Sequence, residues 1–265
     1  SVYRDLNDYP NAVTFFLKSA AIAEETSNAD VALWGNSYSQ LSHLYRTQLN
    51  YTEALDVALK RLEVAERNDN ANNRTYMTIA SCYSKLNDTI NSVKFYNLII
   101  NNLNNAVIDR KNADIIATAM GDYALYGYKD EATHCYELLN RLNKKERPFN
   151  YLSNLSVYYE CFVSIDSAAG ARLELYNTTS RIESKYDASQ WLTRYYASIK
   201  DYEKATEFAI KFIDANLAVN NKRNLEHTTN AKNFFQYRRD KEEETRVMQN
   251  AAKDRDNLVI GVSIS

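Results

Sequence analysis

The chain has 265 residues, of which 45% are hydrophobic and 25% are charged, and its formal net charge is −2. This balance lacks the basic stripe of a nucleic-acid-binding surface, so we expect no direct contact with nucleic acid. Only five Gly and two Pro occur, and because these are the strongest helix breakers, the composition predicts an all-α fold.

A short sequence phrase recurs along the chain at intervals of about 36 to 42 residues. It consists of a polar turn, often with a tyrosine, followed by a small residue that opens a helical face. The small residues are Ala12, Ala54, Ser92, Ala132, Ala168 and Ala205. A period in this range is typical of stacked helix pairs, so a solenoid is predicted rather than one globular core. Residues 1–6 match only the end of a first helix, and we therefore expect the chain to be part of a longer protein.

Large and small side chains follow a fixed order within each unit. Small residues let the two helices of a pair approach closely, and large residues fill the gaps beside them. In the second unit the expected core positions are Tyr38, Leu41, Ser42, Tyr45, Tyr51, Ala54 and Ala58. The chain has 21 tyrosines, mostly at helical spacing, and we expect them to pack between helices rather than to form a ligand cage.

This order of positions resembles the tetratricopeptide repeat family over residues 1–221. The stretch Asp201-Tyr202-Glu203-Lys204-Ala205 carries the resemblance most clearly. Three features depart from the family: the units exceed its usual length of about 34 residues, the closing proline is mostly absent, and residues 147–185 match only loosely. The resemblance implies an α-α superhelix, a right-handed solenoid whose concave face is lined by the first helix of each pair.

If that geometry applies, ten polar residues are expected on the concave face, and they are either a solvated surface or a binding site for a protein, peptide or small ligand. They are Asn36, His43, Arg46, Arg74, Lys85, Asp114, Asn150, Glu160, Gln190 and Arg194. Met77 and Gly121 are expected on the same face. Family members that bind chaperone tails clamp a carboxylate with Lys, Asn and Arg, but the corresponding positions here hold Ser39, His43, Asp114 and Thr118. A chaperone-tail adaptor is therefore not expected.

The last 44 residues change in character. Residues 222–237 retain an apolar stripe and are expected to form a helix that caps the array. Residues 238–257 are rich in both charges, with a thin apolar seam that suggests a long helix able to pair in a homodimer. Residues 258–265, Leu-Val-Ile-Gly-Val-Ser-Ile-Ser, are too few to span a bilayer, which needs about 20 residues. They are either a tail that docks on the repeats or the start of a transmembrane helix that continues beyond Ser265.

This ending resembles a bacterial arrangement, common in the Bacteroides group, in which such repeats precede a charged helix and one membrane span. The resemblance implies a sensor domain on the periplasmic side of the inner membrane, part of a membrane-anchored signalling or transcription-regulatory protein. The alternative is a soluble, cytoplasmic scaffold that assembles partner proteins.

The sequence offers no group of residues with the spacing needed for catalysis. The three histidines lie in separate units, with no metal-site partner at i+3 or i+4. Cys82, Cys135 and Cys161 are too far apart for a disulfide framework or a metal site, and we expect buried free thiols. We therefore predict a non-enzymatic protein without metal or cofactor.

Overall fold

The computed structural model describes residues 13–19, 31–67, 72–103 and 108–222, together with 224–225, 239, 243 and 245–248. All regular structure in these ranges is helical, so the predicted all-α class is confirmed. The helices are α3 (Val31–Thr47), α4 (Tyr51–Arg67), α5 (Asn73–Lys85), α6 (Thr89–Leu103), α7 (Arg110–Leu125), α8 (Lys129–Asn140), α9 (Tyr151–Phe162), α10 (Ile165–Thr178) and α11 (Ile182–Ser198). Residues 13–19 and 202–222 are helical as well.

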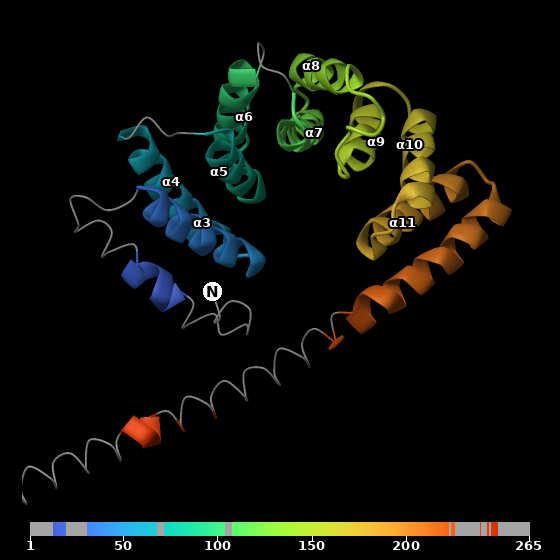
Figure 1. Cartoon of the computed structure of the whole chain (residues 1–265). Helices are drawn as coiled ribbons and strands as arrows, with labels where there is room; N and C mark the ends of the chain where they lie inside the picture. The colour runs from blue at the N-terminus through green and yellow to red at the C-terminus, as the bar shows by residue number, and fades with distance from the viewer. Residues whose placement is uncertain are drawn as a thin grey trace, which may run out of the picture. The chain divides into compact units, whose positions relative to one another are not determined.

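The chain divides into two compact units, Phe15–Asn220 and a second made of Ser1–Thr14 with Asn221–Ser265. Within the first unit, consecutive helices pack as pairs: α3 with α4, α5 with α6, α7 with α8, and α9 with α10. Helix α11 pairs with residues 202–220 through Leu192, Tyr196 and Phe208. Figure 1 shows α3, α5, α7, α9 and α11 along the inner side of a curved row, with their partners outside. The first helix of each pair therefore lines the inner face of this unit.

Four of the five helix pairs are joined by the same backbone turn. One residue in each turn has a positive φ, and the N–H of the next residue donates to the carbonyl five residues before it, which is the Schellman ending of a helix. The left-handed residues are Leu49 (φ 63°), Asn87 (61°), Gly127 (83°) and Lys200 (62°). The carbonyls that accept belong to Tyr45, Tyr83, Tyr123 and Tyr196, at N···O distances of 2.9, 2.9, 2.9 and 3.0 Å. The recurring polar phrase in the sequence thus corresponds to one repeated backbone turn.

The remaining pair, α9 and α10, is joined by a different turn. Val163 has a φ of −119°, and Ser164 caps the next helix by accepting from the Ser167 N–H at 3.0 Å. The extended Ser164 N-cap replaces the left-handed residue, because a serine side chain can itself satisfy the first amide groups of a helix. This difference explains why residues 147–185 match the repeat only loosely.

Small residues lie where the two helices of a pair cross. Ala54, Ser92, Ala132 and Ala168 are fully buried. In the α3/α4 pair, the Ser42 hydroxyl donates to the Ala54 carbonyl at 3.0 Å, and in the α5/α6 pair the Ser92 hydroxyl donates to the Ala80 carbonyl at 3.0 Å. The serine lies on the first helix of one pair and on the second helix of the other, but the hydrogen bond joins equivalent positions in both. A side chain larger than Ala or Ser would force these crossings apart.

Tyrosines and cysteines fill the space around these crossings. Tyr96 and Tyr123 are fully buried, with ring centroids 5.8 Å apart, as the packing interpretation of the tyrosines predicted. Cys82 and Cys135 are buried, but Cys161 is exposed, so the prediction was wrong for that residue. Cys161 lies one residue before the end of α9 at Phe162.

Most of the C-terminal segment, including residues 226–237 and 249–265, lies outside the described residues. The capping helix, the dimerising charged helix and the membrane-bound end therefore stay predictions. Among the helices that the structure does describe, none combines the length and the apolar character needed to cross a bilayer.

Candidate functional site

A pocket of about 510 Å³ opens between α3, α4, α5 and α7. It is lined by Arg46, Arg61, Asn72, Asn73, Arg74, Met77, Thr78, Asp109, Asn112, Asp114 and Ile115. Three of the ten residues predicted for the concave face meet here: Arg46, Arg74 and Asp114. Met77, also expected on that face, lies beside them.

Three arginines give the pocket its chemical character. Burial lowers the pKa of Arg61, and the nearby charge of Arg74 lowers it further. Within the described part of the chain, no carboxylate pairs with Arg46, Arg61 or Arg74, and no hydrogen bond from their guanidinium groups is found. Arg67, farther along α4, differs because it pairs with Glu63. The pocket therefore holds three guanidinium groups that form no ion pair within the described residues, although the charge of Arg74 acts on Asp114.

The opposite wall of the pocket is acidic, but its two carboxylates are not equivalent. Asp109 is engaged as the N-cap of α7, accepting from the Asn112 N–H at 2.7 Å. Burial raises the pKa of Asp114, and Arg74 opposes that shift. The Asp114 Oδ1 atom is buried and has no hydrogen-bond partner. This wall thus contains one buried acceptor that has no partner within the described residues.

Equivalent positions of successive units form a row along the inner helices. Asn36, Arg74, Asp114 and Asn150 lie at the same place in α3, in α5, in α7 and at the N-cap of α9. The Asn150 amide donates to the Asp114 carbonyl at 3.2 Å and to the Thr118 hydroxyl at 3.0 Å. Direct contacts therefore connect the last two members of the row, on α7 and at the N-cap of α9.

The other predicted residues lie apart from the pocket. Asn36 and His43 are exposed on α3, and Arg194 is exposed on α11, where Gln190 is half-buried. Lys85 is exposed at the end of α5, near Asp122 of α7, whose pKa it lowers against the larger effect of burial. Glu160 accepts from the Trp191 Nε1–H at 3.1 Å and so joins α9 to α11. Gly121 faces Asn154 of α9 at close range and lines no open surface.

Sequence reasoning missed Arg61, Asn72, Asp109 and Asn112. Arg61 belongs to the second helix of its pair, which the repeat pattern assigns to the outer layer. A signal was present, because Arg61 lies beside Leu62 and three positions after Ala58, both in the buried stripe of α4. The other three residues start helices α5 and α7, where N-caps are expected.

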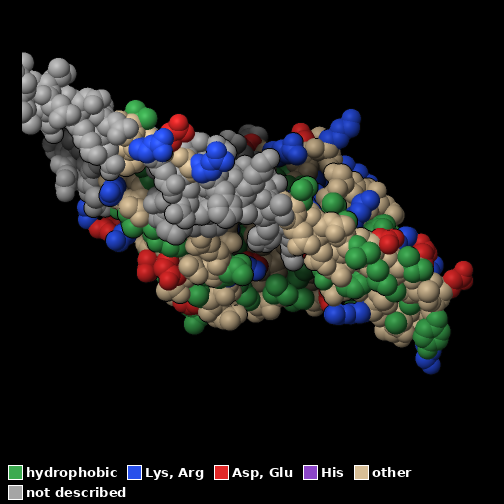
Figure 2. Space-filling model, turned by 90° about the horizontal axis from the view of Figure 1, so that it is seen from below, with side chains coloured by type: hydrophobic (Ala, Val, Ile, Leu, Met, Phe, Trp, Pro, Cys, Tyr) green, Lys and Arg blue, Asp and Glu red, His purple; other side chains and the backbone are tan. Residues whose placement is uncertain are grey.

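Figure 2 shows that Lys and Arg side chains are interspersed with Asp and Glu across the visible face, with no large area of one sign. The mixed charge agrees with the near-zero net charge of the sequence. A concentration of unpaired arginines in one pocket therefore stands out from the rest of the surface.

A second hollow region lies around the loop between α8 and α9, with neighbouring pockets of about 430 and 540 Å³. Both of its arginines are already engaged. Arg147 donates to Asn140 Oδ1 at 3.2 Å and lies 4.7 Å from the centre of the Tyr151 ring, and Arg181 lies 4.6 Å from the centre of the Phe149 ring. Burial raises the pKa of the Tyr159 hydroxyl, which lies 3.4 Å from that of Tyr136. These contacts stabilise the loop and leave fewer groups for a ligand than the arginine pocket does.

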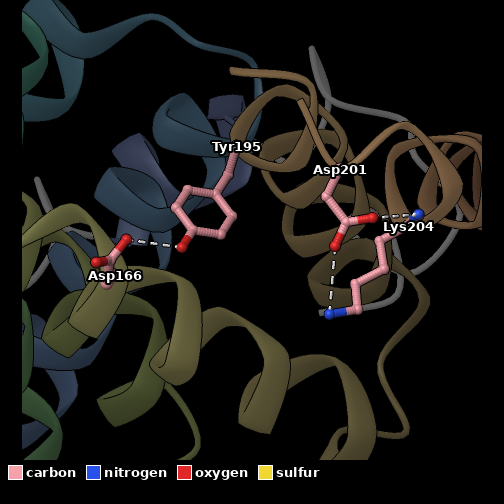
Figure 3. A network of polar contacts seen from close by, with 4 residues as sticks. All are labelled: Asp166, Tyr195, Asp201 and Lys204. Atoms are coloured by element: carbon pink, nitrogen blue, oxygen red, sulfur yellow. Dashed lines mark hydrogen bonds and ion pairs between the residues drawn. The ribbon is translucent and has the colours of Figure 1, made fainter. Parts of the chain in front are cut away.

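At the other end of the unit, polar contacts join the last helices. The Tyr195 hydroxyl donates to Asp166 Oδ1 at 2.7 Å, linking α11 to α10, and this bond raises the pKa of Tyr195 to about 12. In the adjoining turn, Asp201 accepts from the Lys204 N–H at 3.2 Å and pairs with its ammonium at 3.3 Å (Figure 3). The most family-like stretch of the sequence is thus a helix start stabilised by Asp201.

In the described residues, no group of three or more His, Cys, Asp or Glu side chains could hold a metal ion. The polar groups that do converge suit recognition, because they donate and accept hydrogen bonds around an open pocket.

Residues 74–101 match the tetratricopeptide repeat model. The crystal structure of BtubC (BKLC) from P. vanneervenii is similar at 16% identity and a TM-score of 0.63, covering 80% of this chain and 92% of that one. A putative kinesin light chain from Podosopora anserina, with nearly identical TPR-like repeats, is similar at 12% identity and a TM-score of 0.52, covering 69% and 95%. No curated protein matches the sequence.

These matches define the class of protein. The chain has a helical-repeat fold of the tetratricopeptide type, as its sequence predicted. Repeats of this type mediate protein interactions.

Proposed function

We propose that this chain binds an extended segment of a partner protein along the inner face formed by α3, α5 and α7. The observation that carries the proposal is the pocket of about 510 Å³ on that face, where polar side chains from four helices converge and three arginines form no ion pair within the described residues. The row of Arg74, Asp114 and Asn150 continues the polar surface to the next helix. An extended peptide would contact several units at once, which is how a solenoid gains affinity from a shallow surface.

Site-specific photo-crosslinking tests this proposal. A photoreactive amino acid at Thr78, in the pocket, is expected to give a discrete adduct with a partner protein in cells that produce the chain. The same group at Glu66, exposed on α4, is the control and is expected to give none. Equal adducts at both positions, or none at Thr78, would count against binding at the inner face.

A second, finer function is motivated by the C-terminal sequence. The charged residues 238–257 followed by the apolar run 258–265 support a sensor domain that is held at the periplasmic side of a membrane and signals through a paired C-terminal helix. Fractionation of the full-length parent protein, with protease added from the periplasmic side, would decide this point. Recovery in the soluble fraction would favour the cytoplasmic scaffold instead.

A further inference from the structure

The arginine pocket contains a charged side chain that is partly buried but not paired with an acidic group of the described residues. Arg61 is half-buried, which is unfavourable for a charged group unless it is paired. The charge of Arg74, another cation, acts on Arg61 and lowers its pKa beyond the effect of burial. Elsewhere in the described chain, buried arginines have compensating contacts: Arg172 lies near Glu160 and Asp187, and Arg147 lies over Tyr151. The arrangement around Arg61 therefore lacks a counter-charge that similar arginines possess.

The helices around the pocket add to its positive character. Arg74 lies in the first turn of α5, which contains no acidic residue, and the N-terminus of α7 lines the same pocket. The positive ends of helix dipoles favour anions and disfavour cations, so Arg74 is placed against the preference of its own helix. Asn72 caps α5 through the Thr75 N–H at 3.1 Å. A bound anion would be stabilised by the same arginines and helix ends that destabilise one another in its absence.

We propose that this pocket binds an oxyanion, a carboxylate or phosphate group carried by the partner's peptide chain, between Arg61 and Arg74 with Arg46 at its edge. The proposal rests on the proposed function and names the chemistry of its ligand. Guanidinium groups are the donors best matched to both kinds of oxyanion.

Nuclear magnetic resonance of the arginine Nε–H groups tests the proposal directly. The probes are inorganic phosphate and three peptides of one Gly-Ser host sequence that carry Glu-Glu, phosphoserine or Gln-Gln, all at constant ionic strength. The signals of Arg61 and Arg74 are expected to shift and saturate with a common dissociation constant for phosphate and for one or both anionic peptides. The Gln-Gln peptide is expected to cause no shift, and the two anionic peptides show which oxyanion is preferred.

Matched variants separate the pocket from general electrostatics. Arg61→Met and Arg74→Gln are expected to weaken binding at least tenfold, whereas Arg67→Met on the exposed side of α4 changes it less than twofold. Arg61→Met keeps the apolar stem and removes a charge without a described partner, so its melting temperature is expected to be equal or higher. Should that variant fail to fold, Arg74→Gln alters only an exposed side chain and gives the same answer.

Two outcomes would overturn the proposal: shifts that grow linearly and equally at Arg67, or unchanged binding in both pocket variants. Crosslinking from Thr78 in the Arg61→Met background distinguishes this failure from failure of the proposed function. An adduct of unchanged yield would show that a partner binds the face without the anion pocket. If no adduct formed in the protein with Arg61 intact, the proposed function would be contradicted, even if phosphate bound the pocket.

Discussion

The repeated turn yields a pair of substitutions with opposite expected effects. Gly127 has a φ of +83°, whereas Gly170 lies within α10, and neither has an atom within 4 Å of the place where a Cβ would be added. Backbone conformation is therefore the only difference between the two sites. An L-residue in the left-handed region costs about 1–2 kcal/mol, and replacing Gly gains about 0.5–1 kcal/mol of unfolded-state entropy. Gly127→Ala should lose about 0.5–1 kcal/mol, and Gly170→Ala should gain about the same.

The reverse change completes the test. Lys200 occupies the equivalent left-handed position with φ +62°, and its side chain is exposed, so Lys200→Gly should gain about 0.5–1 kcal/mol. Asn87→Gly should change little, because asparagine tolerates this conformation. Urea unfolding followed by circular dichroism, in one buffer, measures all four differences. If Gly127→Ala stabilised the protein as Gly170→Ala does, the assigned turn would be wrong.

Three further predictions concern packing and charge. A Cβ on Gly121 would lie 2.2 Å from Asn154 Oδ1, so Gly121→Ala should couple with Asn154→Ala by at least about 1 kcal/mol in a double-mutant cycle, and additive effects would refute the contact. Ala54→Leu should overpack the α3/α4 crossing and cost about 1–3 kcal/mol of unfolding free energy, whereas unchanged stability would mean that the crossing is looser than described. Burial raises the pKa of Asp122, against the Tyr96 hydrogen bond at 2.8 Å. The stabilising contribution of Asp122 is therefore fully present below about pH 4, the pKa of an aspartate in the unfolded chain. It is lost as the pH rises through the higher pKa of Asp122 in the folded protein. Urea midpoints between pH 4 and 7 should fall less steeply in Asp122→Asn, and identical slopes would contradict this assignment.

The fold could be predicted because its determinants are local and repeated. The small residue five positions after each left-handed residue recurs in Ala54, Ser92, Ala132 and Ala205, and each copy reinforces the interpretation of the others. The turn between α9 and α10 does not follow this pattern, because the Ser164 side chain accepts a hydrogen bond from the helix start and no left-handed residue is used. A repeat pattern identifies only positions that recur, so a turn built with different residues is missed.

The candidate site could be predicted only in part, for a related reason. Arg74 and Asp114 were found because they occupy the same place in successive inner helices, and equivalent places share a face. Arg61 was not found, because its side chain reaches the pocket from the outer helix of a pair. Long side chains of this kind bury an apolar stem and extend a charged end beyond their own layer. Assignment by layer therefore fails first for arginine and lysine.

The row of Asn36, Arg74, Asp114 and Asn150 shows how such a scaffold can acquire specificity. Neighbouring packed helices lie about 8–10 Å apart, a spacing that an extended chain covers in about three residues. A peptide that lies across the row therefore presents about every third side chain to a new unit. Because three of the four helix pairs in the row share one turn, a substitution in the row changes what is recognised without changing the scaffold. The anionic group inferred for the pocket would then fix the register of the segment, and the flanking units would read its neighbours on either side.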